Sequence, residues 1–376
     1  MRFLSVLAAS TLMAAMPASP PEPTGGTGRI YLGSYARRIA IIDEATEKLA
    51  AEIPLKTGIP WAIRLSPDRT RFYVQSADQE HFEVIDVASR RTLDTFTLSD
   101  GNKKVRALAF DVDPQHRVMV MVARTATKLI DRFEIGPPQF IQYDLTAHSV
   151  INTVPWATDP EPQYYFLRLK FSPDGKLLYV FSHEVLIYDA ARLQKIDSWN
   201  FSLPNEPGLG RFELNSMDEG NDEPGYLSGL FAIEDRVEKR RLLVFGRVNL
   251  GRKRIDFFPI GPAIERAEVS FTLAADHKQG YVLVEDIGHH ELWTIDIQAR
   301  RLQSRLEFVG RPRAAIRTSS NGKLIYVHEA GNTIDLYQAA GFKYLRTITL
   351  DADMMYGTFY VVPPRLQPQR PVTQQP

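Results

Sequence analysis

The chain has 376 residues, and its 45 Lys and Arg balance 45 Asp and Glu, so the formal net charge is zero. Hydrophobic residues make up 44% and charged residues 24%, which is typical of a folded globular protein and excludes global disorder. The balanced charge argues against a nucleic-acid-binding protein, which needs a concentrated basic surface. Cysteine is absent, which excludes disulfides, thiolate metal sites and haem attachment through cysteine.

The N-terminus has the layout of a secretory signal peptide over residues 1–19. Arg2 precedes an apolar run that ends near Met16, and the small residues Ala18 and Ser19 follow. The run is shorter than the roughly 20 residues that span a bilayer, and no later segment approaches that length. A buried N-terminal helix is the alternative. We therefore expect an exported protein, periplasmic or secreted, without a membrane span.

Composition changes at both ends of the remaining chain. Residues 20–28 are rich in Pro, Gly and Thr, which predicts a flexible leader. Residues 363–376 are rich in Pro and Gln and lack periodicity, which predicts a disordered tail. Between them, residues 29–362 form a continuous series of short strand signals without long helical periodicity.

A repeated unit fills residues 29–362. Each copy has an apolar strand, a tight turn with Asp, Gly or Asn, an aromatic or β-branched strand, and a strand that ends near Asp. The copies are spaced by about 43 to 58 residues between successive Asp positions, and a double interval of about 107 fits two units. These positions are Asp43, Asp86, Asp144, Asp189 and Asp296. Units of 40–50 residues with four strands each are typical of propeller blades, which shield one another's apolar faces.

Counting the units predicts an all-β fold, a seven-bladed β-propeller over residues 29–362. The first unit, residues 30–55, lacks one strand, and the terminal segment 357–362 supplies it. Pairing the N-terminal blade with the C-terminal strand would close the ring and remove its open edge. Two antiparallel sandwiches are the alternative architecture. Two insertions, 124–138 and 203–224, interrupt the period and are candidate binding loops.

Several motifs resemble known propellers. The turns Ser66-Pro67-Asp68 and Ser172-Pro173-Asp174-Gly175-Lys176, the latter followed by Leu178-Tyr179-Val180, resemble the repeats of the YVTN family, which is WD40-like. A broader resemblance, to the β subunit of quinohemoprotein amine dehydrogenase, covers most of the chain after residue 28. It rests on Arg132–Pro137 with Ile141–Asp144, and on Lys176–His183 with Ser198-Trp199 and the long loop after them.

The second resemblance implies a seven-bladed subunit that holds neither haem nor quinone. Those cofactors belong to partner subunits in that family, so the resemblance implies a scaffold with haem- and quinone-bearing partners. No catalytic motif of the family can be carried over to this chain.

Polar residues near the starts of the inner strands are the main candidate site. In a propeller these starts cluster around one mouth of the central channel. Arginine and aromatic side chains there suit an anionic or planar partner. The alternative is that they cap blades and bond to loop carbonyls. The candidate binding mouth consists of Trp61, Arg106, Tyr164, Tyr165, Arg266, Arg313 and Tyr356, and a second register of channel cations of Arg64, Lys170 and Arg317.

Metal sites and catalytic motifs are not favoured. Adjacent residues on a strand point to opposite faces, so His289 and His290 cannot easily share an ion, and His183-Glu184 has the same weakness. The acidic loop 218–223 could bind calcium, but its spacing matches no known calcium loop, and a solvated loop is favoured. Gly208-Leu209-Gly210 lacks the strand-to-helix context of a phosphate loop, and no nucleophile elbow occurs.

The leading hypothesis is an exported propeller that binds another protein or a small ligand through one face, with no cofactor, metal or catalytic residue of its own. The first alternative is a non-cofactor β-type subunit of a complex like quinoprotein amine dehydrogenase. The second is a propeller hydrolase of the lactonase type, whose paired carboxylates cannot be located in a sequence.

Overall fold

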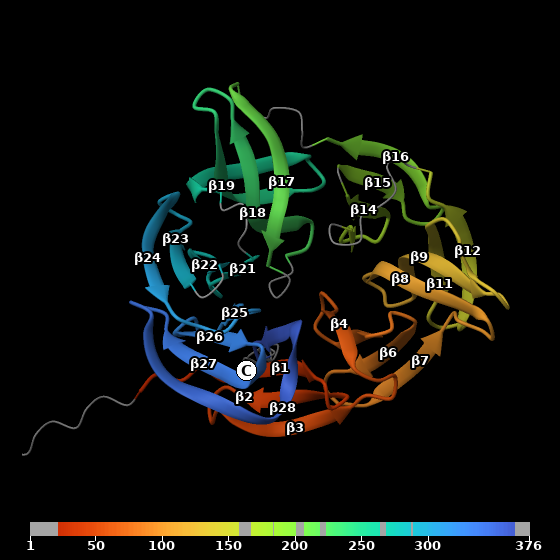
Figure 1. Ribbon diagram of the computed structural model, residues 1–376, viewed down its shortest axis with the longest axis horizontal. Coiled ribbons are helices and arrows are strands. Elements are labelled where there is room, and N and C mark those ends of the chain that lie inside the picture. Colours follow the sequence, from red (N-terminus) through yellow and green to blue (C-terminus); the bar gives the residue numbers. More distant parts are fainter. Residues whose placement is uncertain are drawn as a thin grey trace, which may run out of the picture.

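The computed structural model is an all-β arrangement of sheets around a common centre, as in a β-propeller (Figure 1). Every regular element of the described residues is a strand, which confirms the predicted all-β class. Within those residues, nothing helical offers the length and apolarity for a bilayer crossing. The described residues are 22–157, 167–182, 184–200, 207–218, 223–263, 268–286 and 289–364.

Five separate sheets form blades of four or five antiparallel strands. The first holds β4 (Pro60–Leu65), β5 (Arg71–Ser76), β6 (His81–Asp86) and β7 (Thr92–Thr97). The second holds β8 (Lys103–Val112), β9 (Val118–Lys128), β10 (Phe133–Ile135), β11 (Gln139–Asp144) and β12 (Ser149–Pro155). The third holds β13 (Arg168–Phe171), β14 (Leu177–Phe181), β15 (Val185–Asp189) and β16 (Gln194–Trp199). The fourth holds β17 (Leu209–Met217), β18 (Tyr226–Asp235), β19 (Arg240–Asn249) and β20 (Arg254–Pro262). The fifth holds β21 (Glu268–Leu273), β22 (Gln279–Asp286), β23 (His289–Asp296) and β24 (Arg301–Phe308).

The remaining strands form one seven-stranded sheet, so the structure shows five separate blades and this sheet in place of the predicted closed ring of seven blades. Its order is β25-β26-β27-β28-β1-β2-β3. Strand β28 pairs with β27 along its first half and with β1 along its second half, where Tyr360 lies opposite Tyr31. This continuous strand joins what the sequence indicated as the first and last units. The strands are β1 (Arg29–Ser34), β2 (Arg38–Asp43), β3 (Lys48–Pro54), β25 (Ala315–Thr318), β26 (Leu324–Glu329), β27 (Gly331–Gln338) and β28 (Lys343–Val362).

The middle strands of each unit are buried on both faces, and this explains their composition. In β5 and β2, five and four consecutive residues are buried, so these strands read as near-continuous apolar runs. The outer strand β7 instead alternates between half-buried and exposed residues. A strand covered by neighbouring sheets on both sides needs apolar side chains on both faces, whereas a strand at the rim needs them on one.

The repeated Asp marks a hairpin turn rather than a ligand. Asp43, Asp144 and Asp296 each end the third strand of a unit and accept hydrogen bonds from backbone N–H groups two or three residues later. The turn then needs a left-handed residue four positions after the Asp, such as Glu47 with φ 58°. An Asx turn of this kind fixes the length of the hairpin, which is why the spacing repeats.

Apolar clusters lie between neighbouring sheets. Tyr31 and Ile41 pack with Phe72 across the interface with the β4–β7 blade. Tyr326 and Ile30 belong to a further cluster, so the two halves of the seven-stranded sheet pack face to face. Burying these faces supplies most of the stability of such sheets, because no sheet can cover its own sides.

Residues 22–28, part of the predicted leader, contact the last unit. Asn321 Nδ2 donates to the Thr24 carbonyl at 2.8 Å, and Ser320 Oγ donates to the Gly25 carbonyl at 3.1 Å. Gly25 is required there, because a Cβ would clash with the Tyr326 hydroxyl. Residues 1–19, predicted as a signal peptide, and most of the predicted tail lie outside the described residues.

Candidate functional site

The inner strands are joined by hydrogen bonds between side chains and backbone. Arg317 Nε on β25 donates to the Phe359 carbonyl of β28 at 2.8 Å. The Tyr360 hydroxyl donates in turn to the Ile63 carbonyl of β4. Asp111 on β8 accepts from the Phe171 N–H of β13 at 2.7 Å. These bonds join the inner strands of neighbouring units.

The three predicted channel cations differ in their surroundings. Arg317 is 8% exposed and donates to the carbonyls of Phe359 and Ile316, so it links β25 to β28. Arg64 is half-buried, with its guanidinium 5.5 Å from the Phe110 ring centre. Lys170 is half-buried in β13. For Arg317 the geometry agrees with the capping alternative raised from the sequence.

The structure places four of the predicted mouth residues on four consecutive inner strands. Arg313 precedes β25, Tyr356 precedes the inner half of β28, Trp61 lies in β4 and Arg106 in β8. All four are exposed, with 44% exposure for Trp61 and 39% for Tyr356. Because each unit repeats the same strand order, the starts of the inner strands are expected at one end of the channel. We call the surface of these four residues the mouth face.

The two arginines differ in their surroundings. Arg106 Nε lies 3.5 Å from Glu80, a buried carboxylate that Lys104 Nζ also approaches at 3.3 Å. Arg313 adopts a left-handed backbone with φ 61°, and its N–H donates to Glu285 at 2.6 Å. No ion pair with the Arg313 guanidinium occurs within the part of the chain that the structure describes. Glu285 therefore fixes the backbone of Arg313 and leaves its side chain available.

Sequence reasoning missed one aromatic residue of the mouth face, Tyr35. It is 53% exposed, and its N–H donates to the Asp353 carbonyl at 3.0 Å. Nearby, Gly33 N–H donates to Thr358 Oγ1 at 3.0 Å, and a Cβ on Gly33 would lie 2.7 Å from Pro60. Tyr35, Trp61 and Tyr356 each lie within two residues of this contact. The repeat pattern does not mark an aromatic residue in a turn such as Tyr35, because its position in space depends on the pairing of β1 with β28.

Buried polar groups support the mouth face between β22 and β26. Glu329 accepts from the Arg311 N–H at 2.9 Å and holds the loop that leads to Arg313. Burial lowers the pKa of His328, whose Nδ1 donates to the Thr333 carbonyl at 3.0 Å. The neutral form of the His328 imidazole is therefore favoured.

Some predicted residues do not join this face or lie outside the described residues. Tyr164, Tyr165, Arg266 and His183 are outside them, as are residues 219–222 of the acidic loop. Asp218 of that loop accepts from the Leu273 N–H at 2.6 Å, so it bonds to the next blade. The two adjacent histidines point to opposite faces, as expected from strand alternation: the His289 side chain is 48% exposed and His290 is 1% exposed.

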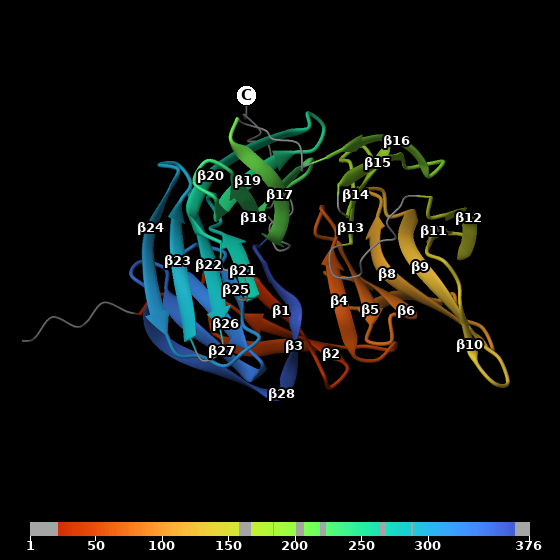
Figure 2. The ribbon, with the colours of Figure 1, turned by 45° about the horizontal axis from the view of Figure 1, so that its top comes forward.

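The insertion 124–138 forms a hairpin that extends β9 and adds β10. Figure 2 shows this hairpin reaching away from the body of the molecule. Its apolar residues are exposed, with 63% for Phe133 and 60% for Ile135. Exposed apolar side chains on a projecting strand are typical of contact surfaces for other proteins.

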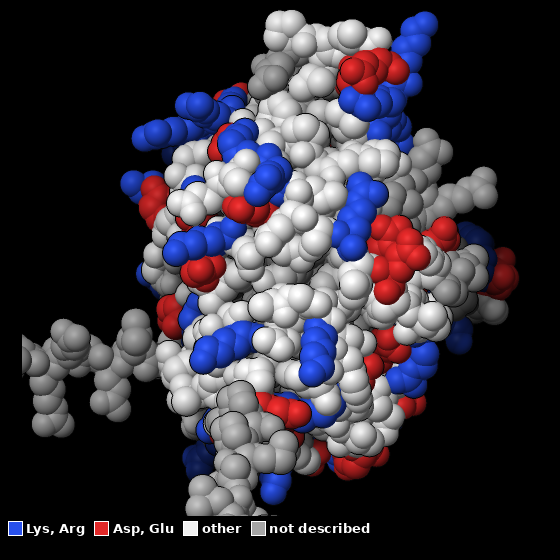
Figure 3. Space-filling model, turned by 90° about the vertical axis from the view of Figure 1, so that its left-hand side faces the viewer, with Lys and Arg blue, Asp and Glu red and all other residues white. Residues whose placement is uncertain are grey.

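The side of the molecule at β24 carries charges of both signs (Figure 3). Viewed from the side of β24, basic and acidic side chains are interspersed with uncharged ones (Figure 3). A shallow hollow near β19 is lined by Arg236, Lys239, Arg240 and Arg241, but carboxylates pair with its arginines, as Glu238 does with Arg240 at 2.7 Å. Such paired exposed charges contribute little attraction for an anion.

Comparison with known proteins supports the fold. The chain is similar to apo AztD from Citrobacter koseri, at 15% identity over 89% of this chain and 98% of that one, with a TM-score of 0.53. It is also similar to a protein of unknown function from Desulfotomaculum acetoxidans, at 14% identity over 90% and 100%, with a TM-score of 0.51. Hydrazine synthase from Kuenenia stuttgartiensis gives 12% identity over 84% and 90%, with a TM-score of 0.47. No family model matches the chain, and no curated protein matches it.

The class that fold and geometry define is therefore an all-β propeller with an exposed mouth face. At these identities the likeness concerns the fold alone, because one propeller fold hosts many unrelated functions.

Proposed function

We propose that this chain is an exported β-propeller that acts as a binding or scaffold protein through its mouth face. The observation that supports this function is the grouping of Arg313, Tyr356, Trp61 and Arg106 on four consecutive inner strands. The guanidinium of arginine offers several hydrogen-bond donors in a fixed plane, and aromatic rings offer flat apolar area. Both side-chain types lose little conformational entropy when a partner binds. The same types dominate binding energy at protein interfaces.

The proposal includes a ring of seven blades. The seven-stranded sheet counts as two blades that share β28, because its halves pack face to face in the cluster of Tyr326 and Ile30. Five separate blades and these two give seven. A closed ring would keep the mouth rigid, and rigidity lowers the entropic cost of binding.

A protein partner fits better than a small ligand. The two surface hollows at Glu234–Arg241 and at Thr46–Leu49 include none of the mouth residues, and small-molecule sites are usually deep and apolar. The projecting hairpin of β9 and β10 offers a second, apolar contact. Among partners, we include haem- and quinone-bearing subunits, which the resemblance to the β subunit of quinohemoprotein amine dehydrogenase implies. Export to the periplasm or outside the cell rests on residues 1–19.

Affinity capture tests this function. The wild-type chain and the variants Trp61→Ala and Arg313→Ala would be immobilised and exposed to an envelope fraction, and bound proteins quantified by mass spectrometry. We expect a partner whose recovery falls at least tenfold in both variants, because each removes an exposed contact without emptying the core. The matched control is Lys176→Ala, an exposed cation in the turn between β13 and β14. Equal recovery by wild type and both variants would contradict the mouth as the binding surface.

A further inference from the structure

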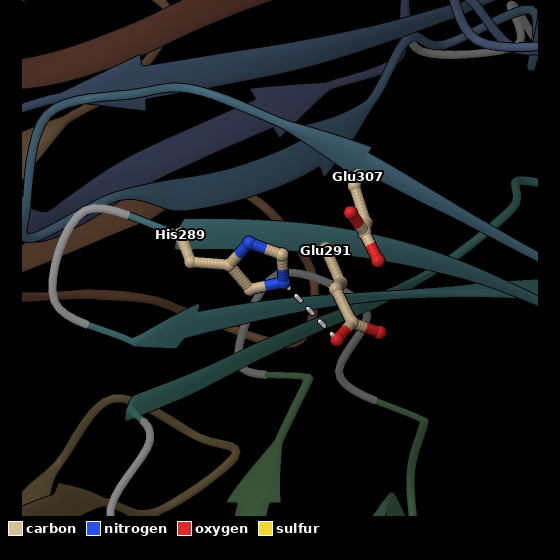
Figure 4. A group of neighbouring side chains, drawn as sticks. All are labelled: His289, Glu291 and Glu307. Carbon is tan, nitrogen blue, oxygen red and sulfur yellow. Dashed lines mark ion pairs between the residues drawn. The ribbon is translucent and has the colours of Figure 1, made fainter.

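Three metal-ligating side chains converge on the solvent side of β23 and β24. His289 and Glu291 are two residues apart on β23, so they point to the same face. Glu307 on β24 lies directly opposite Glu291 in the strand register. One ligand atom from each residue lies within 4.8 Å of the others, and Figure 4 shows the three side chains directed toward one another.

The distance between the first two ligands suits a shared metal ion. His289 Nε2 lies 3.4 Å from Glu291 Oε1. Two ligands at about 2.1 Å from Zn²⁺ in tetrahedral geometry are about 3.4 Å apart. A Glu307 carboxylate oxygen lies within 4.8 Å of both other ligand atoms, and this exposed side chain can rotate toward a shared ion.

A hydrogen bond from the adjoining ring orients one carboxylate. Trp293 Nε1 donates to Glu291 Oε2 at 2.7 Å, while Glu291 Oε1 faces His289. Trp293 is 1% exposed, so its position is fixed by packing. Carboxylates that bind metals are commonly held in this way by a donor behind them, which leaves the other oxygen directed at the ion.

Electrostatics favour a cation between the two strands. Glu291 and Glu307 face each other across the ladder, and like charges in directly opposite positions are destabilising. The nearest arginine on that face, Arg305, lies over the Trp293 ring at 4.0 Å. Within the described residues Glu307 has no ion pair or hydrogen bond. A divalent cation between the two carboxylates would relieve this repulsion.

We propose that His289, Glu291 and Glu307 bind a divalent transition-metal ion, with Zn²⁺ the best fit and water completing the coordination. One imidazole with two carboxylates is a suitable set for Zn²⁺, whereas Mg²⁺ and Ca²⁺ prefer oxygen ligands throughout. The site stands on its own geometry and does not depend on the proposed mouth function. The sequence alone did not favour it, because His289 and His290 cannot share an ion and Glu307 is separated from Glu291 by a hairpin.

Equilibrium dialysis of the tag-free, chelator-treated full chain against Zn²⁺ tests the site. We expect one Zn²⁺ per chain, with the affinity reduced at least tenfold in His289→Ala and in Glu307→Gln. Both substituted side chains, His289 and Glu307, are exposed, so we expect both variants to fold, which circular dichroism would verify. The matched control is His148→Ala, an exposed histidine that pairs with the single carboxylate Asp94 at 3.1 Å and should leave binding unchanged.

Co²⁺ gives a second readout, because a four-coordinate ion would show visible absorption that the two site variants lose. The proposal is overturned if the wild type binds no Zn²⁺ at 100-fold molar excess. It is equally overturned if His289→Ala and Glu307→Gln bind Zn²⁺ as tightly as the wild type and the His148→Ala control.

Discussion

At the scale of single residues, hydroxyl and carboxylate side chains build the turns that the sequence repeats. Ser66 Oγ donates to Asp68 at 2.6 Å and accepts from the Arg71 N–H at 2.9 Å. Ser172 and Asp174 form the same pair in the third separate blade, also at 2.6 Å. The recurring Ser-Pro-Asp motif was thus readable from the sequence as a turn, because its hydrogen bonds are local.

Asp68 gives a pH-dependent prediction. Burial raises the pKa of Asp68, but hydrogen bonds from Ser66, His116 and Thr70 outweigh it and lower the pKa to about 2. A depressed pKa stabilises the fold above the unfolded value of about 3.9, and this contribution is lost as the pH falls toward 2. We expect Asp68→Ala to lower the free energy of unfolding by about 1 kcal/mol at pH 7, after allowance for its exposure.

Chemical denaturation from pH 7 to pH 3 would measure this loss, which should shrink as the pH falls. Asp174→Ala is the control, because Asp174 occupies the same turn position and accepts from Ser172 Oγ at 2.6 Å and from the Lys176 N–H at 3.1 Å. A loss in Asp68→Ala that stays constant over this pH range would argue against the hydrogen-bonded carboxylate as its cause.

The sequence identified some residues of the candidate binding and metal sites and missed others. Trp61 and Arg313 were found because they occupy the same place in the repeat as other polar residues. Glu307 and Tyr35 were missed, since their importance depends on which strand lies opposite. Arg317 was identified by position, but its hydrogen bond to the Phe359 carbonyl depends on a contact across the chain ends.

At the scale of elements, β28 determines how the ends of the chain are held. The sequence indicated a terminal strand over 357–362, and this segment does pair with β1. It did not indicate that the strand runs unbroken from Lys343. The segment near Asp351 has little strand propensity of its own and is held by long-range contacts, such as Arg38 Nη2 to Asp351 at 2.5 Å.

The two halves of β28 should differ in their contribution to stability. Phe359 is fully buried in the cluster between the halves of the seven-stranded sheet, whereas Tyr344 is 51% exposed. We expect Phe359→Ala to lower the free energy of unfolding by about 3–5 kcal/mol through lost burial and a cavity. Tyr344→Ala should change it by less than about 1 kcal/mol. Urea denaturation of both variants measures the contrast, and equal losses would contradict the different roles of the two halves.

At the scale of the whole molecule, the architecture follows from sheets that cannot cover their own apolar faces. The repeat period and the buried middle strands predicted the propeller correctly. The number of separate sheets was not predictable, because it depends on whether the first and last units share a continuous strand. That depends on hydrogen bonds between residues more than 300 positions apart, which leave no local pattern.

The arrangement of the mouth also belongs to this scale. Tyr35 follows β1, Trp61 lies in β4 and Tyr356 in β28, and the pairing of β28 with β1 brings these three segments together. The proposed binding surface and the seven-blade ring therefore depend on the same pairing.

Cysteine cross-linking tests that pairing most directly. The chain has no native cysteine, so only the introduced cysteines can form a disulfide. Arg29 and Val362 are direct partners in the antiparallel register of β1 and β28, at a separation that a disulfide can bridge. The double variant Arg29→Cys with Val362→Cys should form an intramolecular disulfide under mild oxidation, detected by mass spectrometry of the intact chain and its peptides. The control pair, Arg29→Cys with Tyr344→Cys, should remain reduced. Failure of the first pair to cross-link, or equal cross-linking of both, would contradict the account.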